Sequence, residues 1–166
     1  MWNDFIRCIV RTKTIEVPGV ATLFLTDEHG QAPQFVPGQY INVYFPELNT
    51  PEGKAYSISS APREPTFSIT VRAIGEFSNR LCSLSPGDSV DASLPYGFFC
   101  PEQEDSDLVM LAAGIGVTPF RSMLRDIALK NPSRRITLFH SVRKLDDAIF
   151  QKELINVISV ITDEDP

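Results

Sequence analysis

The sequence lacks three features that would place the protein in common functional classes. No stretch approaches the ~18 apolar residues needed to span a membrane, and Asp4, Arg7 and Arg11 interrupt any apolar run at the start. The formal net charge of −6 argues against a general nucleic-acid binder, which would need a basic face. We therefore expect a soluble chain with no membrane span and no nucleic-acid partner.

Cysteine is also scarce. Cys8, Cys82 and Cys100 are odd in number and far apart, so they form neither a disulfide framework nor a metal-binding spacing. We therefore expect reduced thiols, a cytoplasmic location and no metal site. With 43% hydrophobic residues, the chain of 166 residues can bury a real core and form one domain or two small ones.

Strand patterns dominate the first hundred residues. The alternation is clearest after Pro65, where Phe67, Ile69 and Val71 are expected to face inward and the residues between them outward. Similar runs separated by short turns predict six strands, at residues 5–17, 20–26, 41–45, 54–60, 67–72 and 90–94. This arrangement indicates a small antiparallel barrel.

Two short stretches in this region carry candidate binding groups. Residues 54–60 place a cation, an aromatic ring and several hydroxyls on one predicted strand, where they can converge on a flat, charged ligand. A short helix over residues 78–84 is expected to begin at Ser78 as its N-cap, and the free N–H groups of a helix N-terminus form an anion site. The plain alternatives are a half-exposed strand and a capped connector helix.

The pattern changes after an acidic linker that ends at Asp107. The apolar run 108–113 predicts a parallel strand buried on both faces. A glycine loop follows, then a helix with Thr118 as N-cap and Pro119 as its first residue. A strand over 136–141, a helix over 146–156 and a strand over 157–161 complete a βαβαβ pattern, which is half of a doubly wound sheet.

The glycine loop lies between a strand and a helix N-terminus, where a pyrophosphate site is expected. It contains Gly114 and Gly116, but Pro119 stands in place of the third glycine of the usual fingerprint. The second strand leads into Ser141 and Arg143 rather than an acidic residue that would bind a ribose. Alone, this loop could equally be a tight structural turn.

In their order along the chain, these motifs resemble those of the ferredoxin–NADP reductase family of flavoprotein oxidoreductases. The resemblance is carried by the segments 35–40 (FVPGQY), 54–57 (KAYS), 75–79 (GEFSN), 94–97 (LPYG) and 114–119 (GIGVTP). It implies a six-stranded antiparallel Greek-key FAD-binding barrel over residues 1–101. It also implies a partial NAD(P)-binding α/β domain over residues 107–166, with a partial doubly wound parallel sheet.

The resemblance further implies an NAD(P)H-dependent FAD oxidoreductase, with FAD and either NADP or NAD as cofactors. Such an enzyme passes hydride from NAD(P)H to FAD and electrons onward to an acceptor. Ferredoxin, flavodoxin and an oxygenase component are all open as the acceptor, because acceptor surfaces carry no sequence motif.

Roles for particular residues follow from the resemblance. Tyr56 would stack on the flavin ring, and Ser57 would hydrogen-bond near the hydride-accepting atom, so these two are the candidate catalytic residues. Lys54 stands where the family has arginine, so its pyrophosphate contact is expected to be looser. The other candidate flavin-binding residues are Ala55, Val71, Arg72, Gly75, Phe77, Ser78 and Asn79. The candidate nucleotide-binding residues are Gly114, Gly116, Val117, Thr118, Ser141 and Arg143, of which Arg143 favours NADP slightly over NAD.

One strand of a doubly wound sheet is missing, because nothing follows residues 157–161 that could return beside 108–113. The strand 108–113 would then be an open hydrophobic edge. We expect a fragment of a longer protein; the alternatives are completion by another chain, with self-association at the open edge, or a flavin-binding electron-relay subunit without reductase activity. An interaction module without a cofactor is a further hypothesis.

Overall fold

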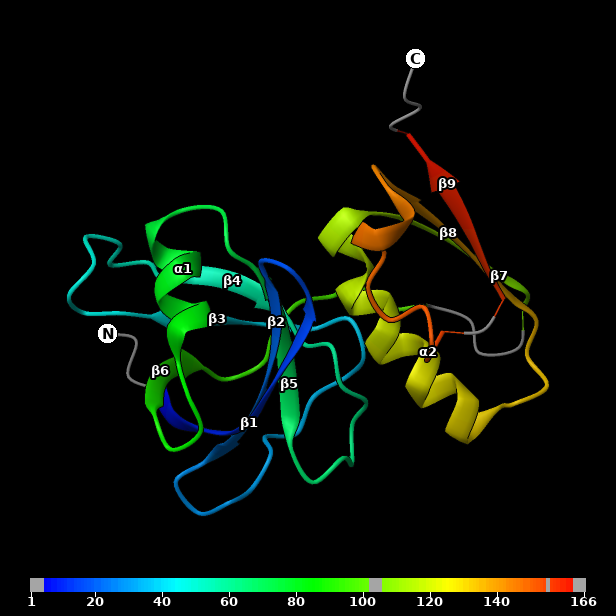
Figure 1. Cartoon of the computed structure of the whole chain (residues 1–166). Coiled ribbons are helices and arrows are strands. Elements are labelled where there is room, and N and C mark those ends of the chain that lie inside the picture. The colour runs from blue at the N-terminus through cyan, green and yellow to red at the C-terminus, as the bar shows by residue number, and fades with distance from the viewer. Residues whose placement is uncertain (1–4, 102–105, 155, 163–166) are drawn as a thin grey trace.

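The computed structural model describes residues 5–101, 106–154 and 156–162, which form two bodies (Figure 1). The first contains β1 (Phe5–Val17), β2 (Val20–Asp27), β3 (Tyr40–Tyr44), β4 (Lys54–Ser57), β5 (Phe67–Arg72), α1 (Glu76–Ser83) and β6 (Ser89–Ser93). Its strands pair in the order β4-β3-β6-β1-β2-β5, always antiparallel. An antiparallel bridge between Ile58 and Ile69 joins the two ends of this order, so the sheet closes. The prediction of a six-stranded antiparallel Greek-key barrel is confirmed.

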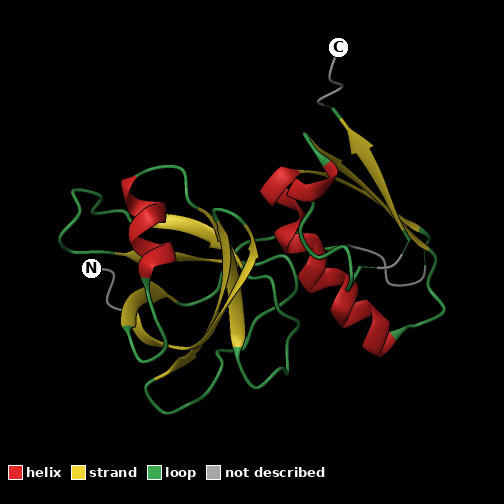
Figure 2. Ribbon diagram, viewed as in Figure 1, coloured by secondary structure: helices red, strands yellow, loops and turns green. Residues whose placement is uncertain are grey.

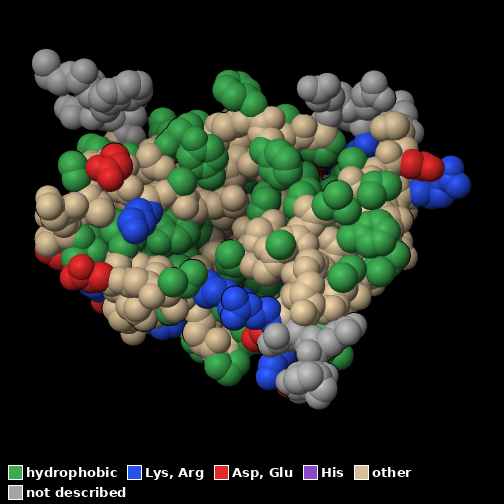
Figure 3. All heavy atoms as spheres, turned by 90° about the horizontal axis from the view of Figure 1, so that it is seen from above, with side chains coloured by type: hydrophobic (Ala, Val, Ile, Leu, Met, Phe, Trp, Pro, Cys, Tyr) green, Lys and Arg blue, Asp and Glu red, His purple; other side chains and the backbone are tan. Residues whose placement is uncertain are grey.

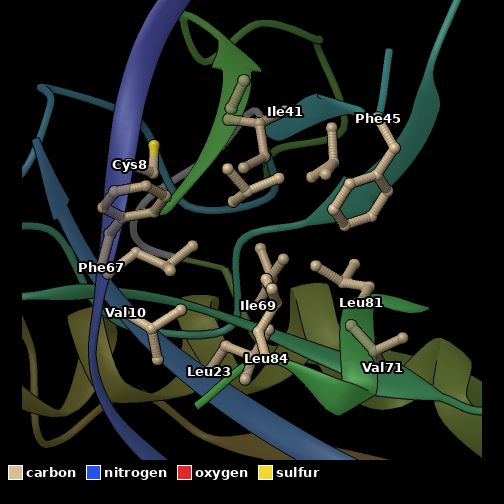
Figure 4. Close-up of a cluster of buried hydrophobic side chains, with 14 of the residues drawn as sticks. Cys8, Val10, Leu23, Ile41, Phe45, Phe67, Ile69, Val71, Leu81 and Leu84 are labelled. Atoms are coloured by element: carbon tan, nitrogen blue, oxygen red, sulfur yellow. The ribbon is translucent and has the colours of Figure 1, made fainter. Parts of the chain in front are cut away.

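Alternate side chains of the strands fill the barrel. Ile41, Phe67 and Ile69 are fully buried, and the labelled side chains in Figure 4 point toward one another from several strands. Helix α1 contributes Leu81 and Phe77 to the same cluster. Burying a side chain of this size contributes about 1.5–3 kcal/mol, so this cluster is a main source of the barrel's stability.

The barrel wall differs from expectation in two places. Strand β4 ends at Ser57 rather than at Ser60, because at Ile58 the chain leaves β3 and crosses to β5. Ser68 and Thr70 lie outside the barrel core, as predicted, but both are buried rather than exposed. Each of their hydroxyls is 2.9 Å from the hydroxyl of Ser59, so hydrogen bonds within the wall satisfy these polar groups.

The second body contains β7 (Leu108–Ala113), the 3₁₀ turn η1 (Gly114–Val117), α2 (Thr118–Lys130), β8 (Ile136–Val142), the 3₁₀ turn η2 (Leu145–Asp147) and β9 (Val157–Ile161). Its strands pair in parallel in the order β7-β8-β9, which confirms the predicted partial parallel sheet. Helix α2 lies between this sheet and the barrel (Figure 2). Val117, not Thr118, is the N-cap of α2, because η1 runs directly into the helix.

Strand β7 is not buried on both faces, contrary to expectation. Met110 is buried in the cluster shared with α2, but its neighbours Val109 and Leu111 are 65% and 71% exposed. Ile158 and Val160 of β9 are exposed as well. Since α2 covers one face of the sheet, the apolar run of β7 alternates between buried and exposed side chains.

The predicted helix over residues 146–156 is wrong. Among the described residues of this range, the only helical element is the short turn η2, and Ala148 is already extended. Ile149 and Phe150 are consecutive and both buried in the second cluster, and Phe150 adopts a left-handed conformation with a φ of 64°. Such a conformation interrupts a helix, so tertiary packing of these two side chains overrides the local helical pattern.

Apolar contacts join the two bodies, since Val17 and Val20 of the barrel pack in the cluster around α2. Among the described residues, no helix combines the length and the apolar character needed to cross a membrane.

Candidate functional site

A groove of about 550 Å³ runs between the barrel and the start of α2, and we call it the first groove. One wall comes from β4, β5 and the N-terminal end of α1; the opposite wall comes from η1 and the first turn of α2. The groove brings together the predicted residues Lys54, Ala55, Tyr56, Ser57, Val71, Arg72, Gly75, Ser78, Gly116 and Thr118. Both bodies therefore contribute to one site.

Tyr56 gives the first groove a flat aromatic wall. Its ring is stacked on that of Phe77, with the planes at 22° and the centroids 6.4 Å apart. Phe77 belongs to the barrel core, so it fixes the orientation of the Tyr56 ring. Burial, with a smaller effect of Cys82, raises the pKa of the Tyr56 phenol to about 12. The side chain therefore stays neutral over the ordinary pH range.

The charges of the first groove are all of one sign. Lys54 and Arg72 line it, and no carboxylate is among its described lining residues. The Arg72 side chain makes no hydrogen bond or ion pair within the described part of the chain, and the Lys54 ammonium lies 5.7 Å from the centroid of the Phe77 ring. In a chain of net charge −6, this local concentration of free cations suits an anionic ligand.

In the view from above, hydrophobic side chains are numerous over the middle of the face, and acidic side chains lie toward its edges (Figure 3).

Ser78 holds the loop before α1 as the third residue of the helix rather than as its N-cap. The helix begins at Glu76 after the N-cap Gly75, so the expectation that Ser78 is the N-cap is wrong. The Ser78 hydroxyl accepts hydrogen bonds from the backbone N–H groups of Ile74 and Gly75, at 2.9 and 3.0 Å. The Asn79 side-chain amide donates to the Gly75 carbonyl at 3.0 Å. These bonds fix the loop that forms one end of the first groove.

A second groove, of about 540 Å³, lies at the carboxyl ends of β7 and β8. It is lined by the predicted residues Gly114, Ser141 and Arg143. A side chain at Gly114 or Gly116 would meet no atom within 4 Å, so the space beside the glycine loop is open. The two grooves share Arg72 and Ile74, which places their junction directly after β5.

Three predicted residues line neither groove. Val117 is fully buried in the second cluster, Phe77 lies in the barrel core under Tyr56, and Asn79 supports the loop at Gly75. Eight further residues line the grooves and were not predicted from the sequence: Thr70, Ile74, Ala113, Ile115, Pro119, Val142, Asp147 and Thr162. Ile74, at 79% exposure, had a signal: it is an apolar residue in the loop directly before a predicted anion site.

A Greek-key barrel followed by a parallel α/β domain, with one groove between them, defines the class of two-domain reductases that use a flavin and a pyridine nucleotide. Comparison with known proteins agrees with this class. Residues 110–159 match the family model described as an oxidoreductase NAD-binding domain. The chain is 31% identical over 147 residues to a flavohemoprotein of Bacillus subtilis, a match that covers 86% of this chain and 37% of the relative.

Two solved structures share the fold along almost the whole chain. Phthalate dioxygenase reductase superposes with a TM-score of 0.83 at 26% identity, covering 98% of this chain and 53% of the reductase. A ferredoxin NADP⁺ reductase of Neisseria gonorrhoeae, solved with bound FAD and NADP, superposes with a TM-score of 0.82 at 25% identity, covering 98% and 70%. The chain belongs to the ferredoxin–NADP reductase-like family of flavoprotein oxidoreductases. It spans about two fifths of the length of the curated relatives it matches.

Proposed function

We propose that this chain is the reductase part of an NAD(P)H-dependent flavoprotein that binds FAD in the first groove and a nicotinamide dinucleotide in the second. The observation that carries this proposal is the junction of the two grooves at Arg72 and Ile74. Two flat cofactors bound there would lie close enough for direct transfer between them. We propose the barrel, residues 1–101, and the α/β part, residues 107–166, as the two cofactor domains.

The residues present fit a flavin dinucleotide. Tyr56 offers a flat, neutral face, and the Ser57 hydroxyl has no hydrogen-bond partner among the described residues, so it is free to bond to a ring atom. Lys54 and Arg72 supply positive charge for a pyrophosphate, and no carboxylate opposes them. Lysine in place of the arginine expected at residue 54 predicts a single, less directional phosphate contact.

The residues of the second groove fit a nicotinamide dinucleotide. The open space beside Gly114 allows a pyrophosphate to approach the backbone closely, and Gly116, which lines the first groove, is equally open. Arg143 suits a 2′-phosphate and hence NADP, whereas Asp147 in the same groove suits the ribose hydroxyls of NAD. These two side chains argue for different nucleotides, so both nucleotides belong in the test.

When bound, the nicotinamide supplies a hydride and the flavin accepts it, because the cofactors carry the chemistry. The chain's own residues align and insulate the reacting rings. Tyr56 fixes the plane of one wall, and Thr118 and Pro119 form the opposite wall. The Ser57 hydroxyl is placed to donate a hydrogen bond to developing negative charge.

We propose that the electrons leave to a one-electron acceptor protein. Phthalate dioxygenase reductase is described as transferring electrons from pyridine nucleotides to a [2Fe-2S] centre, and another relative is the reductase component of a terephthalate dioxygenase. A ferredoxin, flavodoxin or oxygenase component is therefore the proposed acceptor. Three free cysteines in separate places support a reducing compartment, for which we propose the cytoplasm.

The test is a visible absorption spectrum of the chain with added FAD, recorded before and after anaerobic NADPH or NADH. We expect flavin bands that bleach with at least one nucleotide. Tyr56→Ala should weaken FAD binding about tenfold or more, since it removes a stacking surface. The control is Tyr44→Ala, a tyrosine on β3 away from both grooves. An absence of bound flavin in the wild type would contradict the proposal.

A second candidate is a flavin-binding relay subunit whose nucleotide site needs another chain. The exposed Val109 and Leu111 on the edge strand β7 favour it, because a partner strand or a second copy could cover them. It predicts flavin bands that persist with both nucleotides until the partner is added.

A further inference from the structure

Arg121 of α2 connects three segments of the molecule although it is only 4% exposed. Its Nε and Nη2 each donate to one carboxylate oxygen of Glu153 at 2.7 Å. Its Nη1 donates to the backbone carbonyl of Ser59 at 2.9 Å, and the guanidinium lies 4.6 Å from the centroid of the Phe150 ring. A charge is buried this deeply only when it is fully paired, so this side chain holds one fixed geometry.

The bond to Ser59 connects Arg121 to the wall of the first groove that β4, β5 and α1 form. Ser59 is two residues beyond Ser57, at the point where the chain crosses from β4 to β5. Its N–H donates to the Ser68 carbonyl at 2.7 Å, and its hydroxyl bonds to those of Ser68 and Thr70. Ser59 is thus anchored to the barrel wall, and a bond to its carbonyl fixes that wall.

The helix end of the connection leads to the opposite wall. Arg121 lies three residues after Thr118, one turn along α2, and Thr118 and Pro119 line the first groove. A helix is stiff over one turn, so the position of Arg121 determines the position of these residues. One guanidinium is therefore linked to both walls of the groove through two or three residues on each side.

We propose that Arg121 is a positioning residue that sets the separation of the two walls of the first groove. It lines neither groove, so it acts through Ser59 and the first turn of α2. The consequence for hydride transfer rests on the proposed function, whereas the positioning of the walls does not. Displacing reacting groups by about 1 Å can cost on the order of 100-fold in rate.

The geometry requires arginine rather than any cation. Glu153 takes two parallel bonds from the planar guanidinium, and the third direction is left for the Ser59 carbonyl. A lysine ammonium keeps the charge but has no planar fork, so it cannot reproduce all three bonds. Arg121→Lys should therefore loosen the walls while leaving the net charge unchanged.

The matched control is Arg125→Lys, one turn further along the same helix. Arg125 also contacts Glu153, at 3.5 Å, and bonds to Glu64 of the barrel at 2.8 Å. It is 39% exposed and makes no bond to the Ser59 carbonyl. The same substitution at Arg125 thus changes the geometry of a cross-body ion pair but leaves the bond from Arg121 to the Ser59 carbonyl in place.

The first readout needs no cofactor: amide hydrogen exchange of the full chain in the segments 56–60 and 115–121. We expect exchange in both segments to rise about tenfold or more in Arg121→Lys and to change less than about twofold in Arg125→Lys. Unchanged exchange in Arg121→Lys would overturn the proposal. If that variant does not fold, as judged by circular dichroism, Glu153→Gln serves in its place, because it removes one of the two carboxylate bonds.

The second readout is the anaerobic bleaching of bound FAD at saturating NADPH or NADH. We expect bleaching to slow by about 10- to 100-fold in Arg121→Lys, measured with FAD at saturating concentration. If amide exchange rises in Arg121→Lys while its bleaching rate stays that of the wild type, Arg121 does not position the reacting groups. If the wild type itself does not bleach, the proposed function fails, and the exchange measurement alone decides whether Arg121 sets the walls.

Discussion

The two bodies are built from similar apolar strands but bury them to different extents. In the barrel, every residue of β5 up to Val71 is buried. In the α/β part, β7 is more apolar than β5, yet Val109 and Leu111 are more than half exposed. The bridge between Ile58 and Ile69 closes the barrel, whereas β7 and β9 are the edges of the three-stranded sheet that the described residues form. An apolar run therefore predicts a strand, but the topology around it decides how many faces are covered.

Because of this difference, truncating an apolar side chain should lower the free energy of unfolding much more in the barrel than on the exposed face of β7. This is the largest effect that we expect. Ile69→Ala should destabilise the chain by about 2–5 kcal/mol, because it leaves a cavity in a fully closed core. Leu111→Ala should change stability by less than about 0.5 kcal/mol, since most of its side chain is in solvent. Urea unfolding of both variants measures the two values.

Similar losses of unfolding free energy in Ile69→Ala and Leu111→Ala would contradict the expected difference between the two bodies. They would mean that the outer face of β7 is covered in solution, for example by a second copy of the chain. Sedimentation of the wild type at two concentrations separates that case from a monomer.

A smaller effect is expected where the two bodies meet at Gly38. Both Gly38 and Gly87 have φ values that disfavour any other residue, 98° and 96°. A Cβ at Gly87 would meet no atom within 4 Å, but one at Gly38 would overlap the Phe99 carbonyl and crowd Met123 of α2. Gly87→Ala should cost about 1–2 kcal/mol from the backbone alone, and Gly38→Ala about 1–3 kcal/mol more.

The difference between the free-energy losses of these two alanine variants, measured by urea unfolding, gives the steric cost of a Cβ between Gly38, the Phe99 carbonyl and Met123. Equal losses would show that the backbone at Phe99 and the side chain of Met123 move aside freely.

Local patterns were enough to predict most strands. The segments 5–17, 67–72, 108–113 and 157–161 all form the strands expected of them, because alternation or β-branched runs act over neighbouring residues. The helix expected over 146–156 failed for the opposite reason: Phe150 is held by the core and by Arg121, which is far away in sequence. Distant contacts of this kind leave no local signal.

The candidate site was predictable where a motif carries its own chemistry. Lys54, Tyr56 and Ser57 were singled out from one short stretch, and the structure places them in one groove. Thr70 was expected only to face outward, and nothing in the sequence shows which outward residues line a groove. Arg121 gave no signal at all, because a charge within a helical repeat is normally on a solvated face.

The last and smallest contrast concerns the reactivity of the three thiols. Their labelling rates report how closed each region is, and no substitution is needed to measure them. Burial raises the pKa of Cys8 in the barrel core to about 12 and also raises that of Cys82. A raised pKa keeps a thiol protonated, so at pH 8 very little of Cys8 is the reactive thiolate. Cys100 is exposed on the segment between the bodies. We expect a disulfide reagent to label Cys100 first, Cys82 more slowly and Cys8 only after unfolding, as read by mass spectrometry of peptides. Early labelling of Cys8 would show that the barrel opens more readily than its closed topology implies.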